Sequence, residues 1–239
     1  MEKQPAQAAS ASMGKPSLIP AYKPYYTTAY AHIKQDQRAE FMRVLTRDCP
    51  EMAKINMISG GAWESITGDT PFIIHLWQYK DYEDYIDSRT KLGTLPQFKA
   101  FYAEALPTLI DEIFRHVVAL PYCPVFNTDP AQAVLCWNIQ TKRECFAPFF
   151  AKRAAFVGLL KARGWNLSAG WRWDAGSGDL CEVTEMWSFP DESKVLTMIN
   201  AMEDDPALKM PMAEVKALIQ RDTRNLMRPT VYGPPYIKK

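Results

Sequence analysis

Hydrophobic and polar positions along residues 25–120 follow two different spacings. Alternate apolar positions predict strands, and apolar positions three or four residues apart predict helices. Asp36, Asp81 and Pro96 are residues that start or cap helices, and they separate these stretches. The spacing predicts, in order, a strand over Tyr25–Ile33, a helix over Phe41–Ile55, strands over Ser59–Ile66 and Phe72–Tyr79, helices over Tyr82–Arg89 and Phe98–Leu109, and a strand over Ile113–Leu120.

The remainder of the chain repeats this order. Trp63 and Trp171 are 108 residues apart, whereas Trp77 and Trp187 are 110 apart, so one hairpin carries a two-residue insertion. Thr141 and Glu144 have the spacing of a capping box. The pattern predicts strands over Val134–Ile139, Trp165–Trp173, Cys181–Phe189 and Asn225–Tyr232, and helices over Phe146–Leu160, Val195–Met202 and Leu208–Ile219, with Asp191 as the cap of the second helix.

This β-α-β-β-α-β order is that of a ferredoxin-like repeat, and it occurs twice. In such a repeat the helices cover only one face of the sheet, so the other face needs a partner. The expected fold is therefore α+β: tandem ferredoxin-like repeats that pair sheet to sheet as a dimeric α+β-barrel, a pseudo-dimer within one chain. The alternative is a homodimer in which two chains cover each other's sheets.

The predicted boundaries follow from this repeat. Residues 25–121 form the first repeat, 122–132 a linker and 133–232 the second repeat. Residues 1–24 are rich in Ala, Ser, Gln, Lys and Pro and cannot bury enough apolar surface to order themselves. This N-terminal arm and the C-terminal tail, residues 233–239, are expected either to be disordered or to bind a protein partner.

Composition excludes several classes of function. The net charge of +1 provides no basic surplus for binding nucleic acid or an anionic membrane surface. No apolar run approaches the ~20 residues of a transmembrane helix. The five cysteines are odd in number and contain no CxxC pair, which argues against a disulfide scaffold and against a zinc ribbon. The N-terminus is not expected to be a secretory signal, and it makes a poor transit peptide because Glu2 comes early and the first arginine is Arg38; a presequence that is atypical or already removed is the alternative.

One stretch of the first repeat resembles a known family. The segment His75-Leu76-Trp77-Gln78-Tyr79, the later Arg89 and Pro96, and the upstream Gly60-Gly61-Ala62-Trp63 are similar to the pattern of the NIPSNAP family. The resemblance covers about residues 25–120 and is weaker over 130–232. In the second repeat Glu185 stands in place of His75 and Ile199 in place of Arg89.

The resemblance implies a dimeric α+β-barrel, a mitochondrial setting, and a role in binding or quality-control assembly. A cytoplasmic location is the alternative. The wider superfamily includes antibiotic-biosynthesis monooxygenases and haem-binding enzymes, which implies that a pocket against the sheet can exist. Fold alone does not choose among these roles.

The histidines are candidates for acid-base chemistry. Strand alternation places Phe72, Ile74 and Leu76 toward the helices and therefore His75 on the opposite face of the sheet. If Glu185 reaches that face, His32, His75 and Glu185 would form a cluster able to handle protons. Their spacing is not a metal motif, so no metal is predicted. The alternative is that these histidines are buried and hydrogen-bonded for structural reasons.

A set of aromatic strand residues and one arginine are the ligand-pocket candidates. The aromatic residues could line a pocket or could simply fill the space between the sheets. Arg89 could pair with Asp84 or Asp87, or could bind an anion. The glycines at 176–178 belong to a hairpin turn and not to a phosphate loop. The candidates are Tyr30, Trp63, Trp77, Tyr79, Arg89, Trp171 and Trp187.

The first functional hypothesis is a binding or assembly module without catalysis, an accessory subunit of a larger mitochondrial complex that docks through its two arms and needs no cofactor. The alternative is a small cofactor-independent, monooxygenase-like barrel, or a haem or small-molecule carrier, that uses the aromatic pocket with His32 or His75.

Overall fold

The computed structural model describes residues 24–67, 71–124, 126, 132–174, 179 and 181–230. Its first half contains β1 (Tyr25–Ile33), α1 (Arg38–Met52), β2 (Ile58–Ser65), β3 (Phe72–Tyr79), α2 (Tyr82–Thr94), α3 (Pro96–Ala105) and β4 (Leu109–Ala119). Its second half contains β5 (Ala133–Thr141), α4 (Phe146–Lys161), β6 (Asn166–Trp173), β7 (Glu182–Phe189), α5 (Glu192–Asp204), α6 (Pro206–Lys216) and β8 (Ile219–Pro229). The predicted element order is therefore correct, and both halves share it.

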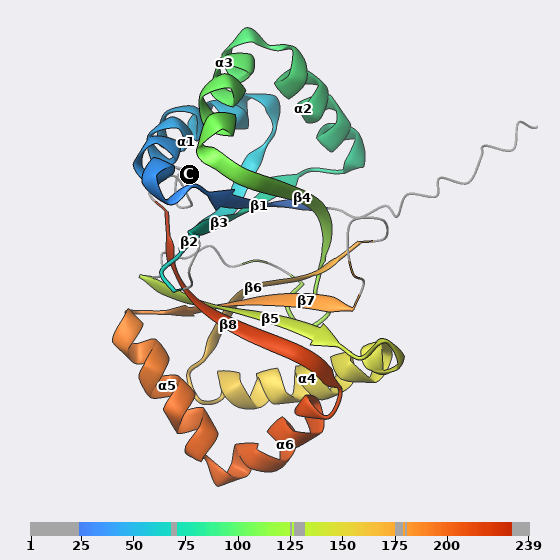
Figure 1. The fold of residues 1–239 in the computed structure, drawn as a ribbon. Helices are drawn as coiled ribbons and strands as arrows, with labels where there is room; N and C mark the ends of the chain where they lie inside the picture. Colours follow the sequence, from blue (N-terminus) through green and yellow to red (C-terminus); the bar gives the residue numbers. More distant parts are fainter. Residues whose placement is uncertain are drawn as a thin grey trace, which may run out of the picture.

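The strands form a closed barrel in the order β1-β3-β2-β8-β5-β7-β6-β4. Each half supplies four neighbouring strands, and among the described residues these strands pair antiparallel throughout. The two sheets join along β2 with β8 and along β4 with β6, with three paired positions at each seam. Figure 1 shows the two sheets facing each other, with α1–α3 outside the first and α4–α6 outside the second. The barrel thus closes within one chain.

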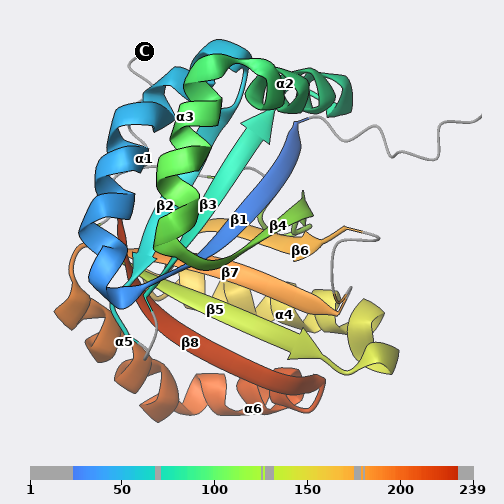
Figure 2. The ribbon, with the colours of Figure 1, turned by 45° about the horizontal axis from the view of Figure 1, so that its top comes forward.

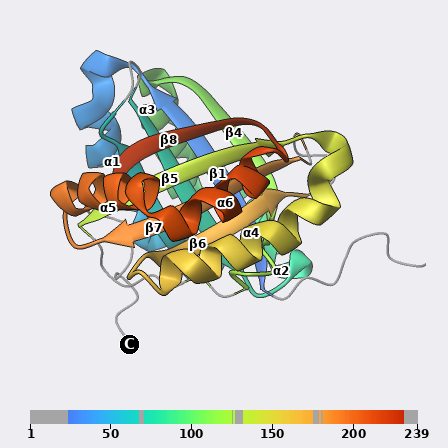
Figure 3. The ribbon, with the colours of Figure 1, turned by 90° about the horizontal axis from the view of Figure 1, so that it is seen from below.

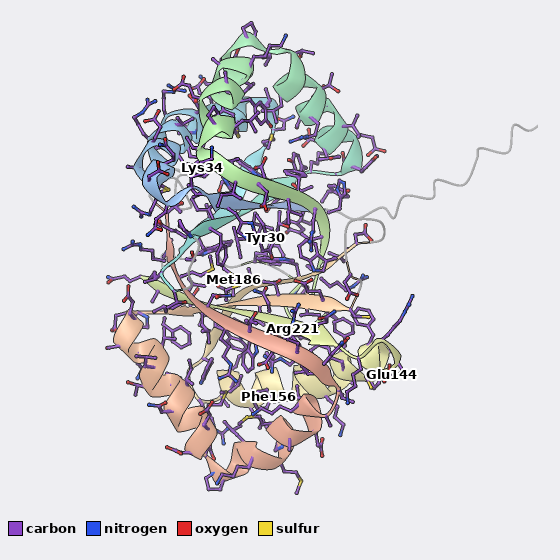
Figure 4. All side chains as sticks on the ribbon, in the orientation of Figure 1. Tyr30, Lys34, Glu144, Phe156, Met186 and Arg221 are labelled. Atoms are coloured by element: carbon purple, nitrogen blue, oxygen red, sulfur yellow. The ribbon has the colours of Figure 1, made fainter. Side chains whose placement is uncertain are left out.

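Three apolar layers follow from this arrangement. The helices α1 and α3 cover the outer face of the first sheet (Figure 2), and α4–α6 cover that of the second (Figure 3). A third cluster fills the barrel interior, where the rings of Trp63 and Trp171 stack with centroids 6.4 Å apart. Tyr30 and Met186 lie in this space between the sheets (Figure 4). Strands such as β3 and β7 are therefore buried on both sides, whereas residues 110–113 of β4 and 220–223 of β8 are exposed.

Polar contacts reinforce the seam between β2 and β8. The carboxylate of Glu64 is almost completely buried and accepts hydrogen bonds from Arg38 and, across the seam, from Arg228 at 3.4 Å. The backbone N–H of Thr230 donates to the carbonyl of Ala62 at 2.9 Å. The buried carboxylate of Glu64 therefore has a cationic partner on each side of the seam between β2 and β8.

Two predicted helix caps are correct and two are wrong. Asp81 and Asp191 accept hydrogen bonds from the backbone N–H groups of Asp84 and Lys194, as N-caps do. Asp36 caps nothing, because it lies inside a 3-10 turn, Gln35–Gln37, that precedes α1. A 3-10 turn, Arg143–Cys145, also precedes α4, so the capping box of Thr141 and Glu144 does not form.

Two strand starts also differ from prediction. The fourth strand begins at Leu109 and the eighth at Ile219, where an apolar helical stripe was expected to continue. Leu109 and Ile219 pair with Ile33 and Thr141 across the β-bulge that follows each first strand. Residues 1–23 of the predicted N-terminal arm, the predicted tail 233–239 and Gly176-Ser177-Gly178 lie outside the described residues.

Candidate functional site

The strand β3 places His75 under the helices of the first half. Its neighbours Ile74 and Leu76 belong to the cluster inside the barrel, whereas Trp77 packs with the helices. The predicted orientation of this strand, with His75 facing away from the helices, is therefore wrong. Both faces of β3 are buried, so its apolar pattern could not distinguish them.

The predicted cluster of His32, His75 and Glu185 does not form. His32 lies on the opposite side of the first sheet from His75, near the rim, where its Nδ1 is 2.6 Å from Oδ1 of Asp111. Glu185 lies under the helices of the second half. His116 contacts the hydroxyl of Tyr25 at 2.7 Å. Over the part of the chain that the structure covers, no three His, Cys, Asp or Glu residues are placed to hold a metal ion.

A cavity lies between the outer face of the first sheet and helices α1–α3. It contains about 590 Å³ of empty space, counting the mouth that opens to solvent, and the centres of water-sized molecules can occupy about 80 Å³ of it. Such a space holds several waters or a small organic molecule. Its lining is mainly apolar, with a few polar groups: Ala29, Ala31, Phe41, Leu45, Met52, Met57, Ile73, His75, Trp77, Arg89, Leu92, Phe101, Tyr102, Glu112 and Phe114.

His75 is the most deeply buried titratable group of this cavity. It is 4% exposed, and its ring stacks on Trp77 with centroids 3.7 Å apart and an interplanar angle of 25°. Its Nε2 lies 3.1 Å from Oγ of Ser59. Burial lowers the pKa of His75 to about 3, because the charged imidazolium would be desolvated. The ring is therefore neutral at physiological pH and acts as a hydrogen-bonding group.

Arg89 brings the positive charge of the cavity from α2. Its guanidinium carbon lies 4.6 Å from the centroid of the Phe114 ring. The expected pairing with Asp84 or Asp87 is not seen: Asp87 pairs with Lys91 at 2.6 Å, and Asp84 accepts from Asn56 at 2.7 Å. Among the described residues, no carboxylate lies within 4.0 Å of the Arg89 guanidinium.

Two further polar residues flank Arg89. Burial raises the pKa of Tyr102, an effect that Arg89 partly opposes through its charge and a hydrogen bond. Glu112 lines the cavity as well; burial raises the pKa of its carboxyl, and the charge of Arg89 partly opposes this rise. Neither residue was among the predicted site residues, although both belong to the stretch that resembles the NIPSNAP family.

The corresponding place in the second half is filled. Ala29 lies opposite His75, and the matching pair in the second half is Trp137 opposite Glu185. Trp137 therefore stands where the first half has only a methyl group. The guanidinium carbons of Arg153 and Arg224 lie 4.2 and 4.3 Å from the centroid of its ring.

Hydrogen bonds hold the side chains around Trp137 in place. Arg153 donates to both oxygens of Glu185, at 2.8 and 2.6 Å, and the two side chains are 1% and 0% exposed. Tyr122 and Trp187 donate to the same carboxylate at 2.8 and 2.9 Å. The indole N–H of Trp137 donates to Asp222 at 2.8 Å. The second half thus has a packed polar network where the first half has a cavity.

The remaining sequence candidates are spread over the three layers. Trp77 and Arg89 line the cavity. Tyr30, Trp63 and Trp171 lie inside the barrel, and Trp187 belongs to the second half. Tyr79 packs under α2 with an edge-to-face contact to Tyr85 at 5.3 Å. The sequence does contain a signal for the contrast between the two halves: the 108-residue spacing matches Ala29 with Trp137 and Leu45 with Arg153.

Comparison with known proteins identifies the first half. Residues 28–124 match the model of the NIPSNAP family, as the sequence pattern predicted. No curated protein matches this chain.

Several solved structures share the whole fold. They include putative monooxygenases from Fusobacterium nucleatum, at TM-score 0.63 and 10% identity over 89% of this chain and 94% of that one, and from Lactobacillus acidophilus, at 0.60 and 8% over 88% and 95%. An anthrone oxidase-like protein has a TM-score of 0.58 and 8% identity over 87% and 92% of the two chains. At these identities the likeness shows the α+β-barrel fold alone.

Proposed function

We propose that this protein binds a small organic molecule in the cavity of its first half, with the barrel as a rigid scaffold. The single observation that carries the proposal is the contrast between Ala29 and Trp137. One half closes this position with a buried indole, while the other half leaves it open and surrounds it with His75, Trp77 and Arg89.

An empty cavity in a protein core lowers stability, and a bound ligand offsets that loss. Interiors are close-packed, and each buried void forfeits contacts that a side chain could make. An apolar cavity with a few convergent polar groups is the common form of a ligand site. Here the polar groups are the neutral His75 ring, the Arg89 guanidinium, Tyr102 and Glu112, within a mainly apolar lining.

The proposal includes the origin of the two halves. We infer that each half is a ferredoxin-like βαββαβ repeat and that the chain is a tandem pseudo-dimer of them. In support, the first sheet has the order β4-β1-β3-β2 and the second has the equivalent order β8-β5-β7-β6. On this view one repeat kept its pocket, and the other exchanged it for the Arg153–Glu185 network.

The proposal is for binding and not for turnover. The solved structures named as monooxygenases are too distant to carry their activity to this chain, and the predicted His32–His75–Glu185 cluster is not formed. Docking of residues 1–24 and 233–239 onto a larger mitochondrial assembly stays a prediction, because residues 1–23 and 233–239 lie outside the described residues.

The test is to close the cavity with the side chain that the second half uses. Ala29→Trp should abolish the binding of any fragment found by protein-observed NMR on the wild-type protein. Ala29→Leu is a smaller filling variant in case the indole does not fit. Ala155→Trp is the matched control, since Ala155 is exposed on α4 and far from the cavity in sequence and fold. Unchanged fragment binding in the folded Ala29 variants would refute the site.

A further inference from the structure

The charge of Arg89 is the feature of the cavity that points to a ligand class. Its side chain is partly buried, and within the described residues no carboxylate lies within 4.0 Å of its guanidinium, although Glu112 of the same lining is close enough for the two charges to interact. A guanidinium presents a planar set of N–H donors that match a carboxylate in a bidentate geometry. An arginine held in this way over Phe114 is poised for an anionic group that enters from the mouth.

The shape of the cavity indicates a flat ring. In the second half the same position holds an indole with guanidinium groups near its ring. In the first half the stacked rings of His75 and Trp77 and the ring of Phe114 form aromatic parts of the lining. Aromatic walls favour an aromatic ligand through stacked and edge-to-face contacts.

From these two features we propose that the ligand is a small aromatic carboxylate. Its ring occupies the space that Trp137 fills in the second half, and its carboxylate binds the guanidinium of Arg89. This inference rests on the proposed function, since it names the ligand class of the same cavity. Glu112 lines the same cavity and its charge interacts with that of Arg89, so the ligand carboxylate competes with Glu112 for the guanidinium.

The experiment is calorimetric titration of the full-length chain with benzoate, benzamide and acetate. Benzoate is the aromatic anion, benzamide has the ring without the charge, and acetate has the charge without the ring. Wild-type protein should bind benzoate more tightly than the other two. In Arg89→Gln the benzoate Kd should rise about 10-fold or more, which is typical for the loss of a charge-assisted hydrogen bond, and benzamide binding should be unchanged.

Arg143→Gln is the matched control, because it removes one exposed positive charge in the second half. It should leave the benzoate Kd unchanged. If benzamide binds as tightly as benzoate, or if Arg89→Gln has no effect on benzoate, the anionic class is wrong although the cavity still binds small molecules. If neither ring compound binds, the aromatic class is wrong; if Ala29→Trp leaves the binding of a ring compound intact, the proposed function falls as well.

Discussion

Arg153 and Glu185 form a bidentate ion pair whose two side chains are almost completely shielded from solvent. The pair joins α4 to β7, with N–O distances of 2.8 and 2.6 Å. A buried pair of this kind is costly to desolvate, and removal of one member leaves an uncompensated charge. It is therefore a sensitive point of the second half.

We expect Arg153→Leu to lower the free energy of unfolding by about 3–5 kcal/mol, because Glu185 would remain buried without its cation. The double variant Arg153→Leu with Glu185→His recreates the Leu45 and His75 pair of the first half and should lose less than the single variant. Urea denaturation of the three proteins measures this. A double variant that is less stable than the single would show that the two halves do not tolerate the same chemistry at this position.

His75 predicts a dependence of stability on pH. Its pKa is lowered to about 3 in the folded protein, from 6.5 for an ordinary histidine, so the unfolded chain binds the extra proton below pH 6.5. Stability contributed by the neutral ring is thus present above 6.5 and is lost as the pH falls toward 3, at about 1.4 kcal/mol per pH unit.

The corresponding variant is His75→Gln, which cannot take up that proton. Between pH 7 and pH 5 the wild-type protein should lose about 2 kcal/mol more than the variant does, because a single proton accounts for that difference. Urea unfolding at both pH values gives the two slopes. Parallel losses in the two proteins would mean that His75 is protonated in the folded state.

Gly61 is required by the backbone of β2. Its φ of +151° is unfavourable for other residues, and a Cβ atom there would lie 2.2 Å from the ring of Trp63. Gly61→Ala should cost about 1–3 kcal/mol or more. Gly158→Ala, on α4 with no atom within 4 Å of the added Cβ, should instead stabilise by about 0.5–1 kcal/mol. Thermal unfolding of both variants compares the signs, and equal effects would contradict this role for Gly61.

The helix caps offer a comparison between two aspartates that the sequence had marked alike. Asp191 accepts from the backbone N–H of Lys194 at 2.8 Å, whereas Asp36 caps no helix. Asp191→Ala should lower the free energy of unfolding by about 1 kcal/mol, and Asp36→Ala should change it by less than about 0.5 kcal/mol. Chemical denaturation distinguishes them, and an equal loss would mean that Asp36 stabilises α1 by another route.

The sequence by itself determined the local elements. Apolar spacing and turn residues predicted every strand and helix in order, and Asp81 and Asp191 as caps, because these features depend on neighbours within a few residues. The predicted caps at Asp36 and Thr141 were wrong for a related reason: a single 3-10 turn shifts the start of a helix, and the residue pattern does not record it.

Only the tertiary structure decided which side of each strand faces the helices. The residues Ile74, His75 and Leu76 are all buried, so alternation in β3 gave no contrast between the faces. The seams between β2 and β8 and between β4 and β6 were equally invisible, because pairing between distant strands depends on how the two sheets pack.

Both the sequence and the tertiary structure are needed to account for the cavity. Ala29 and Trp137 occupy matching positions of the two halves in the sequence. Only the strand register, which sets Ala29 opposite His75 and Trp137 opposite Glu185, shows which position is open and which is filled. A void is a property of the space between elements and not of any one residue. That is why the sequence identified Trp77 and Arg89 as candidates, while the fold alone brought them together around an open position.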